Sequence, residues 1–386
     1  MFFKYFLFSP QTRIIMTTTV SGSTKKFSDK TAIKPATQLI KYCVGIDVSK
    51  ASLEVCLRSI DIEQTGVIKG SRSFKNDKKG FEALSGWITK LYKDTSVPLT
   101  IVMEATGVYH EGVAYFLAKK DCKVSIVLPN KAKKYFQAMG FKSKNDKIDA
   151  SGLSQMGCEQ KLPLWTMPGI ATQQLRDLTR YAEFLNVQMT ACIGRMESYD
   201  YRGIPTDKVT KHLKSLQNAL KKQLKEVHRE IEAHVKAHPE LEKKVECITS
   251  INGVGILTAA VIISEMNDFQ LIENQRQLTS YCGYDVVENQ SGKKAGKTKI
   301  SKKGNAHVRR ILYMPALSVV RLGVRQFADL YKRVFERRGI KMVAYVAVQK
   351  KLLTTIYALY KKSEFFNPEF NIKAEKVVEN AMTVSA

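Results

Sequence analysis

The sequence predicts an α/β amino-terminal domain, then a helical linker, then a mostly helical carboxy-terminal domain. Short apolar runs with strand periodicity occur between residues 42 and 128, and none is found from about residue 171 to residue 238. An apolar repeat with helical spacing then fills the middle of the chain. We place the three domains at residues 39–165, 166–242 and 243–365.

The first domain opens with three predicted strands. Residues 42–46 form an apolar run that ends at Asp47, residues 52–57 alternate like the return strand of a hairpin, and residues 66–74 add a third strand. Asn76 is the expected N-cap of the helix that follows. One face of that helix carries apolar residues at spacings of 3, 4 and 3: Phe81, Leu84, Ile88 and Leu91.

Helices and strands alternate in the rest of this domain. We expect a strand at 99–103, a helix at 108–119, a strand at 123–128 and a helix at 146–156. The order is then βββαβαβα. A meander of three strands followed by alternating helices and strands is the layout of ribonuclease-H-like domains, of which RuvC is one.

The predicted linker carries a long heptad-like repeat. Its apolar residues recur at spacings of 3, 4, 4, 3, 4 and 4: Leu213, Leu216, Leu220, Leu224, Val227, Ile231 and Val235. This pattern predicts an amphipathic helix with a coiled-coil seam, ended by Pro239. A helix packed on its own domain and a dimerising hairpin both explain it.

The carboxy-terminal domain contains a glycine turn, Gly253-Val254-Gly255, before a helix-like segment at 258–266. Helix-hairpin-helix elements present the backbone N–H groups of such a turn to a phosphate. A purely structural turn explains the glycines equally well.

The composition favours a nucleic-acid partner. The chain has 386 residues, with 62 lysines and arginines against 36 acidic residues, and a formal net charge of +26. Because like charges repel, such a chain is stabilised by a polyanion, and nucleic acid is the natural one. Charge alone does not separate an enzyme from a ribosome-associated or other noncatalytic basic protein, so the motifs must decide.

Other features exclude several classes of protein. The seven cysteines are widely spaced without a C-x-x-C pair, which is typical of reduced thiols in a cytoplasmic protein. His234 and His238 lack a second pair of zinc ligands. No run of 18 apolar residues predicts a membrane span. Residues 1–38 predict a disordered extension with Met1 or Met16 as the start, and residues 366–386 predict a tail.

Four carboxylates occupy positions that bring them together. Asp47 and Glu104 each end a predicted strand, and Asp146 and Asp149 lie three residues apart on one helix face. Two such charges about 4 Å apart repel by roughly 4 kcal/mol at an effective dielectric constant near 20, so a cluster of four needs cations. Oxygen ligands favour Mg²⁺ or Mn²⁺, and two such ions activate phosphodiester cleavage. Taken singly, each acid is also explained as a cap or a surface charge.

A basic loop follows in the third domain. Between residues 291 and 310 there is no acidic residue, and eight cations predict a phosphate-binding track: Lys293, Lys294, Lys297, Lys299, Lys302, Lys303, Arg309 and Arg310. Ser291 precedes Gly292 in this field of positive charge, which lowers the cost of an alkoxide, so it is a candidate nucleophile. A flexible Ser-Gly turn is the alternative, and Ser301 and Tyr284 compete for the role.

These residues together resemble the insertion-sequence 110 transposase family. In the first domain the resemblance rests on VGIDVSK at 44–50, EATG at 104–107 and DKIDA at 146–150. In the last domain it rests on INGVG at 251–255, TAA at 258–260, YCG at 281–283, SG at 291–292, ISKKGN at 300–305 and RR at 309–310. The order and spacing of the motifs match over residues 42–320. Two positions depart from the family pattern: Asn145 replaces a common Thr, and Tyr284-Asp285-Val286 replaces Leu-x-Pro.

The resemblance implies a mechanism and partners. It implies a RuvC-like domain with an Asp-Glu-Asp-Asp metal site at Asp47, Glu104, Asp146 and Asp149, a coiled-coil linker, and a transposase domain in which Ser291 forms a covalent phosphoserine with DNA. It also implies a tetramer with shared active sites, guided by a bridge RNA that pairs with donor and target DNA. A dimer is the smallest assembly that we expect.

Two other functions stay open at this point. A RuvC-like junction nuclease uses the metal site and water, and the last domain then serves as a DNA clamp. A noncatalytic nucleic-acid-binding protein descended from such an enzyme is the third interpretation, and the complete set of four carboxylates argues against it.

Overall fold

The computed structural model of the protein describes residues 38–141, 143, 145–203, 207–270, 272–288, 290–291, 294–296 and 298–369. The predicted extension lies outside these residues except for residue 38, and the predicted tail except for residues 366–369. The chain divides into two compact units, Met1–Trp165 and Thr166–Ala386. The predicted linker and the last domain belong to the same unit.

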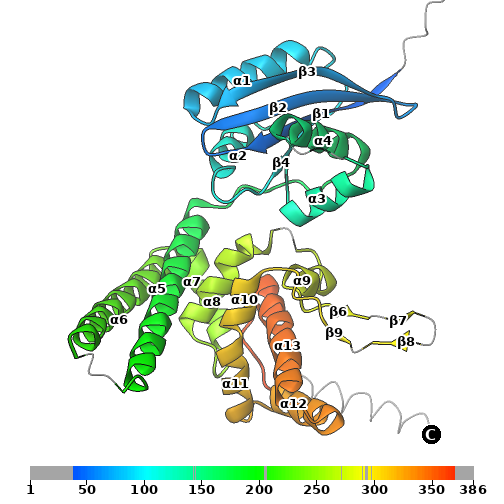
Figure 1. The fold of residues 1–386 in the computed structure, drawn as a ribbon. Helices are drawn as coiled ribbons and strands as arrows, with labels where there is room; N and C mark the ends of the chain where they lie inside the picture. Colours follow the sequence, from blue (N-terminus) through cyan, green and yellow to red (C-terminus); the bar gives the residue numbers. More distant parts are fainter. Residues whose placement is uncertain are drawn as a thin grey trace, which may run out of the picture. The chain divides into compact units, whose positions relative to one another are not determined.

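The amino-terminal unit is built on a five-stranded sheet with the strand order β3-β2-β1-β4-β5 (Figure 1). Strands β1, β2 and β3 pair antiparallel, whereas β4 pairs parallel with both β1 and β5. The strands are β1 (Leu39–Val48), β2 (Ser52–Asp61), β3 (Gly66–Lys75), β4 (Leu99–Glu104) and β5 (Val124–Val127). The unit is a mixed α/β fold, as expected.

Helices cover both faces of this sheet because the residues of β1 alternate between two apolar cores. Val44 and Ile46 pack in the core that includes residues of α1 and α2, whereas Cys43 packs on the opposite face with Leu153 and Met156 of α4. The helices are α1 (Lys78–Leu91), α2 (Glu111–Ala118), α3 (Pro129–Ala138) and α4 (Asp146–Glu159).

Two local predictions differ from the structure. Helix α1 is capped by Asp77, whose side chain accepts a hydrogen bond from the Gly80 N–H at 2.7 Å, and not by Asn76. The Asn76 amide instead donates to the Ser49 carbonyl at 2.8 Å. Helix α3, which begins at Pro129 directly after the predicted strand 123–128, is absent from the prediction because proline usually interrupts regular structure. Proline is well tolerated at the first position of a helix, where its missing N–H has no partner to lose.

The carboxy-terminal unit begins with two long helices, α5 (Ile170–Asp200) and α6 (Asp207–Lys236), which pack against each other (Figure 1). Within α6 the repeat residues Leu220, Val227, Ile231 and Val235 are buried and Leu224 is half-buried, whereas Leu216 is 49% exposed. The seam of α6 is therefore at least partly covered by its own chain. Contact between copies of the chain stays a prediction.

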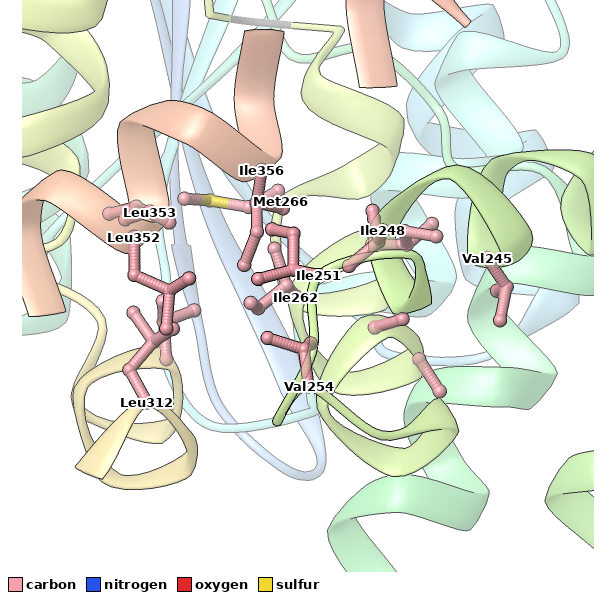
Figure 2. Packing of buried hydrophobic residues seen from close by; sticks show 14 of the residues in the cluster. Val245, Ile248, Ile251, Val254, Ile262, Met266, Leu312, Leu352, Leu353 and Ile356 are labelled. Carbon is pink, nitrogen blue, oxygen red and sulfur yellow. The ribbon is translucent and has the colours of Figure 1, made fainter. Parts of the chain in front are cut away.

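The remaining helices share one core with this helical pair. Figure 2 shows its centre, where Ile248, Ile262 and Ile356 from three helices lie close together. The helices are α7 (Pro239–Thr249), α8 (Ile256–Glu265), α9 (Gln275–Tyr281), α10 (Ala306–Ile311), α11 (Tyr313–Arg321), α12 (Arg325–Arg338) and α13 (Lys341–Lys362), with a 3₁₀ turn at Asn267–Phe269. This part of the chain is mostly helical, as expected.

Four strands of two residues each interrupt the helices between α9 and α10. Strands β6 (Val286–Val287) and β9 (Lys299–Ile300) pair antiparallel, and farther along β7 (Gln290–Ser291) pairs with β8 (Lys294–Ala295). We call residues 286–300 the serine hairpin. Within the described residues, no helix combines the length and apolar character needed to cross a bilayer.

Candidate active site

Asp47 and Glu104 lie side by side at the ends of neighbouring strands. The parallel register of β1 and β4 runs to the pair Ile46 and Met103, and the two acids follow this pair directly. Carboxyl ends of parallel strands meet at one edge of a sheet, where ligand sites form in open α/β sheets. The sheet therefore holds these two carboxylates next to each other at one edge.

Helix α4 brings the other two acids to the same edge. A Cβ at Gly45 would lie 2.1 Å from the Ala150 carbonyl oxygen, and a Cβ at Gly157 would lie 2.2 Å from the Cys43 sulfur. Thus the end of α4 lies over the start of β1, and the helix runs antiparallel to the strand. Its first turn, with Asp146 and Asp149, consequently lies toward the end of β1 that carries Asp47.

The side chains involved share one face of the sheet. Gly45 and Asp47 are two residues apart on β1, so they point to the same side, which is the side that α4 covers. Val102 touches the position of Gly157 in the same way, and Glu104 is two residues after it on β4. All four predicted carboxylates therefore belong to the α4 face at one edge of the sheet.

The electrostatics of Asp47 agree with this placement. Burial raises the pKa of Asp47 most, and the negative charges of Asp146, Asp149 and Glu104 raise it further, to about 6. A hydrogen bond from the Val48 N–H acts in the opposite direction. All three other predicted carboxylates thus lie near enough to disfavour the charged form of Asp47.

The predicted carboxylates do not, however, lie at the short mutual distances of metal ligands in the described part of the chain. Among the described residues, no group of three or more His, Cys, Asp or Glu side chains has the arrangement of a metal site. Proximity sufficient to raise a pKa does not require the short distances of ligands, since charge acts over several ångströms. The donor set itself fits a hard divalent cation, because it consists of carboxylate oxygens on a shared face.

A fifth carboxylate that the sequence analysis missed lies on the other side of Asp47. In the antiparallel register of β1 and β2, Glu54 stands directly opposite Asp47, so both point to the α4 face. One oxygen of Glu54 is buried without a hydrogen-bond partner in the described part of the chain. The tight turn after Asp47 was the available signal, since a hairpin closed between residues 48 and 53 pairs residues 47 and 54.

The capping role of Asn145 accounts for its presence at a position where the family commonly has threonine. Its side chain accepts a hydrogen bond from the Ile148 N–H at 2.8 Å and so caps α4 directly before Asp146. Threonine and asparagine are both favoured N-caps, so either residue starts this helix at the same place.

Ser291 belongs to the serine hairpin. It ends β7, and its backbone pairs with Lys294 of β8. The predicted cations Lys293 and Lys297, like Gly292, lie outside the described residues. Lys299, Lys302 and Lys303 are exposed near the base of the hairpin.

The two competing nucleophiles have structural roles. The Tyr284 side chain is buried, its hydroxyl lies 3.0 Å from the Gln349 side-chain oxygen, and burial raises the pKa of its phenol. The Ser301 hydroxyl donates to the Asp285 carboxylate at 2.9 Å. Both hydroxyl groups are therefore engaged within the protein.

Both predicted arginines are engaged by the protein itself. One nitrogen of Arg309 donates to the carbonyls of Cys282, Gly304 and Asn305 at 2.8–3.2 Å. Arg310 forms an ion pair with Glu183 of α5, which also contacts His307. Arg309 thus supports the loop at the base of the hairpin, and its predicted contact with phosphate is less favoured than that of the exposed lysines.

A buried acid anchors the same loop. Glu265 is 4% exposed and accepts hydrogen bonds from Arg180 at 2.8 Å and from Asn305 at 2.8 Å. Burial raises the pKa of Glu265, but these hydrogen bonds outweigh burial and lower the pKa below its usual value. Asn305 also caps α10, so the end of the hairpin is fixed to the helical core at α5 and α8.

The glycine turn before α8 has a packing role at its first glycine. Gly253 has a φ of +100°, and a Cβ there would lie 3.1 Å from that of Ser318. Gly255 faces open space and precedes α8 as its N-cap. The structural interpretation therefore explains Gly253, while phosphate binding at this turn stays a prediction.

Two families of transposases match the chain. The family described as "Transposase IS116/IS110/IS902 family" matches residues 245–332, and the family described as "Transposase", with the name DEDD_Tnp_IS110, matches residues 44–199. The two matched ranges contain the carboxylates, the first part of the helical pair and the serine hairpin.

Characterised relatives span most of the chain. A pilin gene-inverting protein of Moraxella bovis is 27% identical over 329 residues, which cover 85% of this chain and 98% of that protein. A transposase for insertion sequence element IS1111A of Coxiella burnetii is 24% identical over 353 residues, which cover 84% of this chain and 90% of that protein. A solved structure of Thermus thermophilus RuvC matches at 10% identity with a TM-score of 0.26, and the match covers 32% of this chain and 99% of that one.

Proposed function

Since this chain belongs to the IS116/IS110/IS902 family of transposases, we propose that it moves its insertion sequence by metal-dependent cleavage and exchange of DNA strands. The chain is thus a DNA transposase or recombinase by family. The observation that carries the metal dependence is the meeting of Asp47, Glu104 and the first turn of α4 at one edge of the sheet.

We assign the amino-terminal unit to the ribonuclease-H-like fold on its own topology. The strand order is β3-β2-β1-β4-β5, and only β2 runs antiparallel to the other four strands. This is the sheet that we expect for that fold. In this assignment Asp47 is the penultimate residue of the central strand β1.

The four acids would hold one or two divalent cations, Mg²⁺ or Mn²⁺. Such ions supply a Lewis acid that stabilises the charge developing on a phosphodiester. The protein's part is to fix the ligands: Asp47 and Glu104 are held by paired strands, and Asp146 and Asp149 by a capped helix. Glu54 lies next to Asp47 and would hold it in position or accept a hydrogen bond from a water bound there.

Ser291 would be the nucleophile of strand exchange. Its hydroxyl oxygen forms a bond to phosphorus, the bond from phosphorus to the 3′ oxygen breaks, and the serine proton passes to the departing 3′ hydroxyl. The product is a 5′-phosphoserine, and the reverse attack by another 3′ hydroxyl rejoins DNA and releases the enzyme. The position of Ser291 on a hairpin whose sequence contains four lysines between residues 293 and 299 supports this role.

The decisive substitution for this role is Ser291→Ala. The wild-type chain, incubated with Mg²⁺, its element-end DNA and the noncoding RNA of its element, is expected to give a protein–DNA adduct that survives denaturing electrophoresis, and Ser291→Ala is expected to give none. Ser301→Ala is the matched control and should retain the adduct. Strand cleavage by Ser291→Ala at the wild-type rate would identify a nuclease that uses water and would exclude the serine mechanism.

We further propose that a bridge RNA and a tetramer complete the active complex. The net charge of +26 suits a second polyanion besides DNA. A noncoding segment beside the gene that is complementary to both donor and target junctions is the observation to seek. Strand exchange by the purified chain without any RNA would contradict this part of the proposal.

A further inference from the structure

A groove of about 550 Å³ lies between the base of the serine hairpin and helices α12 and α13. Val286 and Ile300 line it from the hairpin, and Val334, Met342 and Val343 line it from the helices. Val286, Met342 and Val343 are 59%, 52% and 43% exposed. Apolar side chains that gather on a surface in this way mark a binding site rather than ordinary exposure.

The rim of the same groove is positively charged. Four exposed cations lie on it, Lys299, Arg337, Arg338 and Lys350, against one acid, Glu288. None of the four forms an ion pair with another described residue. The surrounding sequence has the same bias, since residues 289–362 contain nineteen lysines and arginines and only two acids. The rim is thus complementary to a polyanion.

Apolar walls beneath a cationic rim fit unpaired nucleotides better than a duplex. A single strand offers bases to apolar side chains and phosphates to the cations. A duplex keeps its bases stacked inside and offers the apolar walls nothing. The volume lies within the range of about 300–1,000 Å³ that is usual for ligand sites, so it has room for an unstacked base.

The groove is also next to the proposed nucleophile in the sequence. Val287 ends β6, beside Val286 of the wall, and Ser291 follows it by four residues. We propose that this groove binds the unpaired DNA strand whose phosphate Ser291 attacks. The choice of DNA rests on the proposed function, whereas the preference for a single strand rests on the groove alone.

The test measures binding in full-length Ser291→Ala protein, so that no covalent product forms. The probe is a fluorescent single-stranded DNA of mixed sequence, compared with the same sequence as duplex and as RNA. The groove variant is Lys299→Gln with Lys350→Gln, and its matched control is Lys221→Gln with Lys222→Gln, two exposed lysines of α6 outside the groove. Both variants lose the same charge.

We expect the groove variant to bind single-stranded DNA about tenfold more weakly than the control variant, with a smaller loss for the duplex. The slope of log affinity against log salt should fall by about 1.4, since each phosphate contact on a single strand contributes roughly 0.7. Equal affinities of the groove and control variants would overturn the proposal, as would equal losses for single strand and duplex. A larger loss for RNA than for DNA would overturn the choice of DNA.

A second variant tests the apolar wall without changing any charge. Val343→Trp fills the groove from an exposed position of α13, so it should leave folding intact and weaken single-strand binding. If Val343→Trp instead abolishes self-association and leaves DNA binding unchanged, the groove is an interface between copies of the chain and the proposal fails. These binding results do not depend on whether Ser291 forms an adduct, so failure of the serine mechanism is measured separately.

Discussion

Asp47 is the residue that links the sheet to the other carboxylates. It ends the central strand, stands beside Glu104 and opposite Glu54, and its pKa is raised by burial and by three other acids. A folded protein holds an ionised side chain in such a place only at a cost, which a bound cation offsets. The raised pKa of Asp47 therefore predicts that the stability of the folded chain depends on pH.

Stability should fall with rising pH in the range set by Asp47. Its pKa is about 6 in the folded chain and 3.8 in an ordinary environment, so the folded state binds the proton more tightly. This contribution is present below pH 3.8 and is lost as the pH rises to about 6. Mg²⁺ should therefore raise the unfolding midpoint more at pH 7.5 than at pH 4.5. The same rise at both pH values, or in Asp47→Asn, would contradict the assignment.

The placement of single residues could be predicted from the sequence where the pattern is local, and their catalytic roles stay a prediction. The positions of Asp47 and Asp146 followed from strand and helix patterns, and the structure brings their charges together. Glu54 was missed because its position depends on strand pairing and not on a motif. Arg337 and Lys350 were missed because they reach the groove only after α12 and α13 have packed beside the hairpin.

At the scale of elements, the contact of α4 with β1 determines where the acids lie. Gly45, Gly152 and Gly157 allow the helix to approach closely, since a Cβ at each would lie within 2.5 Å of a neighbouring atom. Gly45 of β1 faces the backbone of α4, Gly157 of α4 faces Cys43 and Val102 of the strands, and Gly152 faces Phe136. The contact is therefore a requirement for the site as well as for the core.

Gly45→Ala should destabilise the amino-terminal unit. Its added Cβ meets backbone atoms of α4, which cannot rotate away as a side chain would, so we expect a loss of about 1–3 kcal/mol in the free energy of unfolding. Gly86→Ala is the control: it lies in α1 with open space around it and should stabilise by up to about 1 kcal/mol. Tryptophan fluorescence during urea unfolding reports this unit, because Trp87 and Trp165 both lie in it. Equal stability of Gly45→Ala and wild type would contradict the close contact.

Elements with a long periodic pattern were predictable, and short ones were not. Helix α1 buries Phe81, Leu84 and Ile88 at helical spacing, and strands β1, β2 and β4 contain nearly continuous buried runs. Helix α3 buries only Ala132 and Tyr135, which is too weak a pattern to indicate a helix in the sequence. The strands of the serine hairpin have two residues each, so no periodicity exists to detect.

At the scale of the whole molecule, the two units divide the chemistry. The amino-terminal unit holds the four predicted carboxylates, and the carboxy-terminal unit holds Ser291, the helical pair and the basic loop. Metal binding and covalent attack should consequently be separable by mutation. The net charge of +26 belongs to the molecule as a whole and favours assembly with nucleic acid over the isolated chain.

The most direct test of this account is Mn²⁺ binding by the full-length chain, followed by electron paramagnetic resonance at pH 7.5. Asp146→Asn with Asp149→Asn is compared with Asp177→Asn with Asp200→Asn, two exposed acids of α5 that lose the same charge. We predict that wild type and the α5 variant bind Mn²⁺ and cleave DNA, whereas the α4 variant loses both and still binds DNA. Undiminished Mn²⁺ binding by the α4 variant would contradict the account.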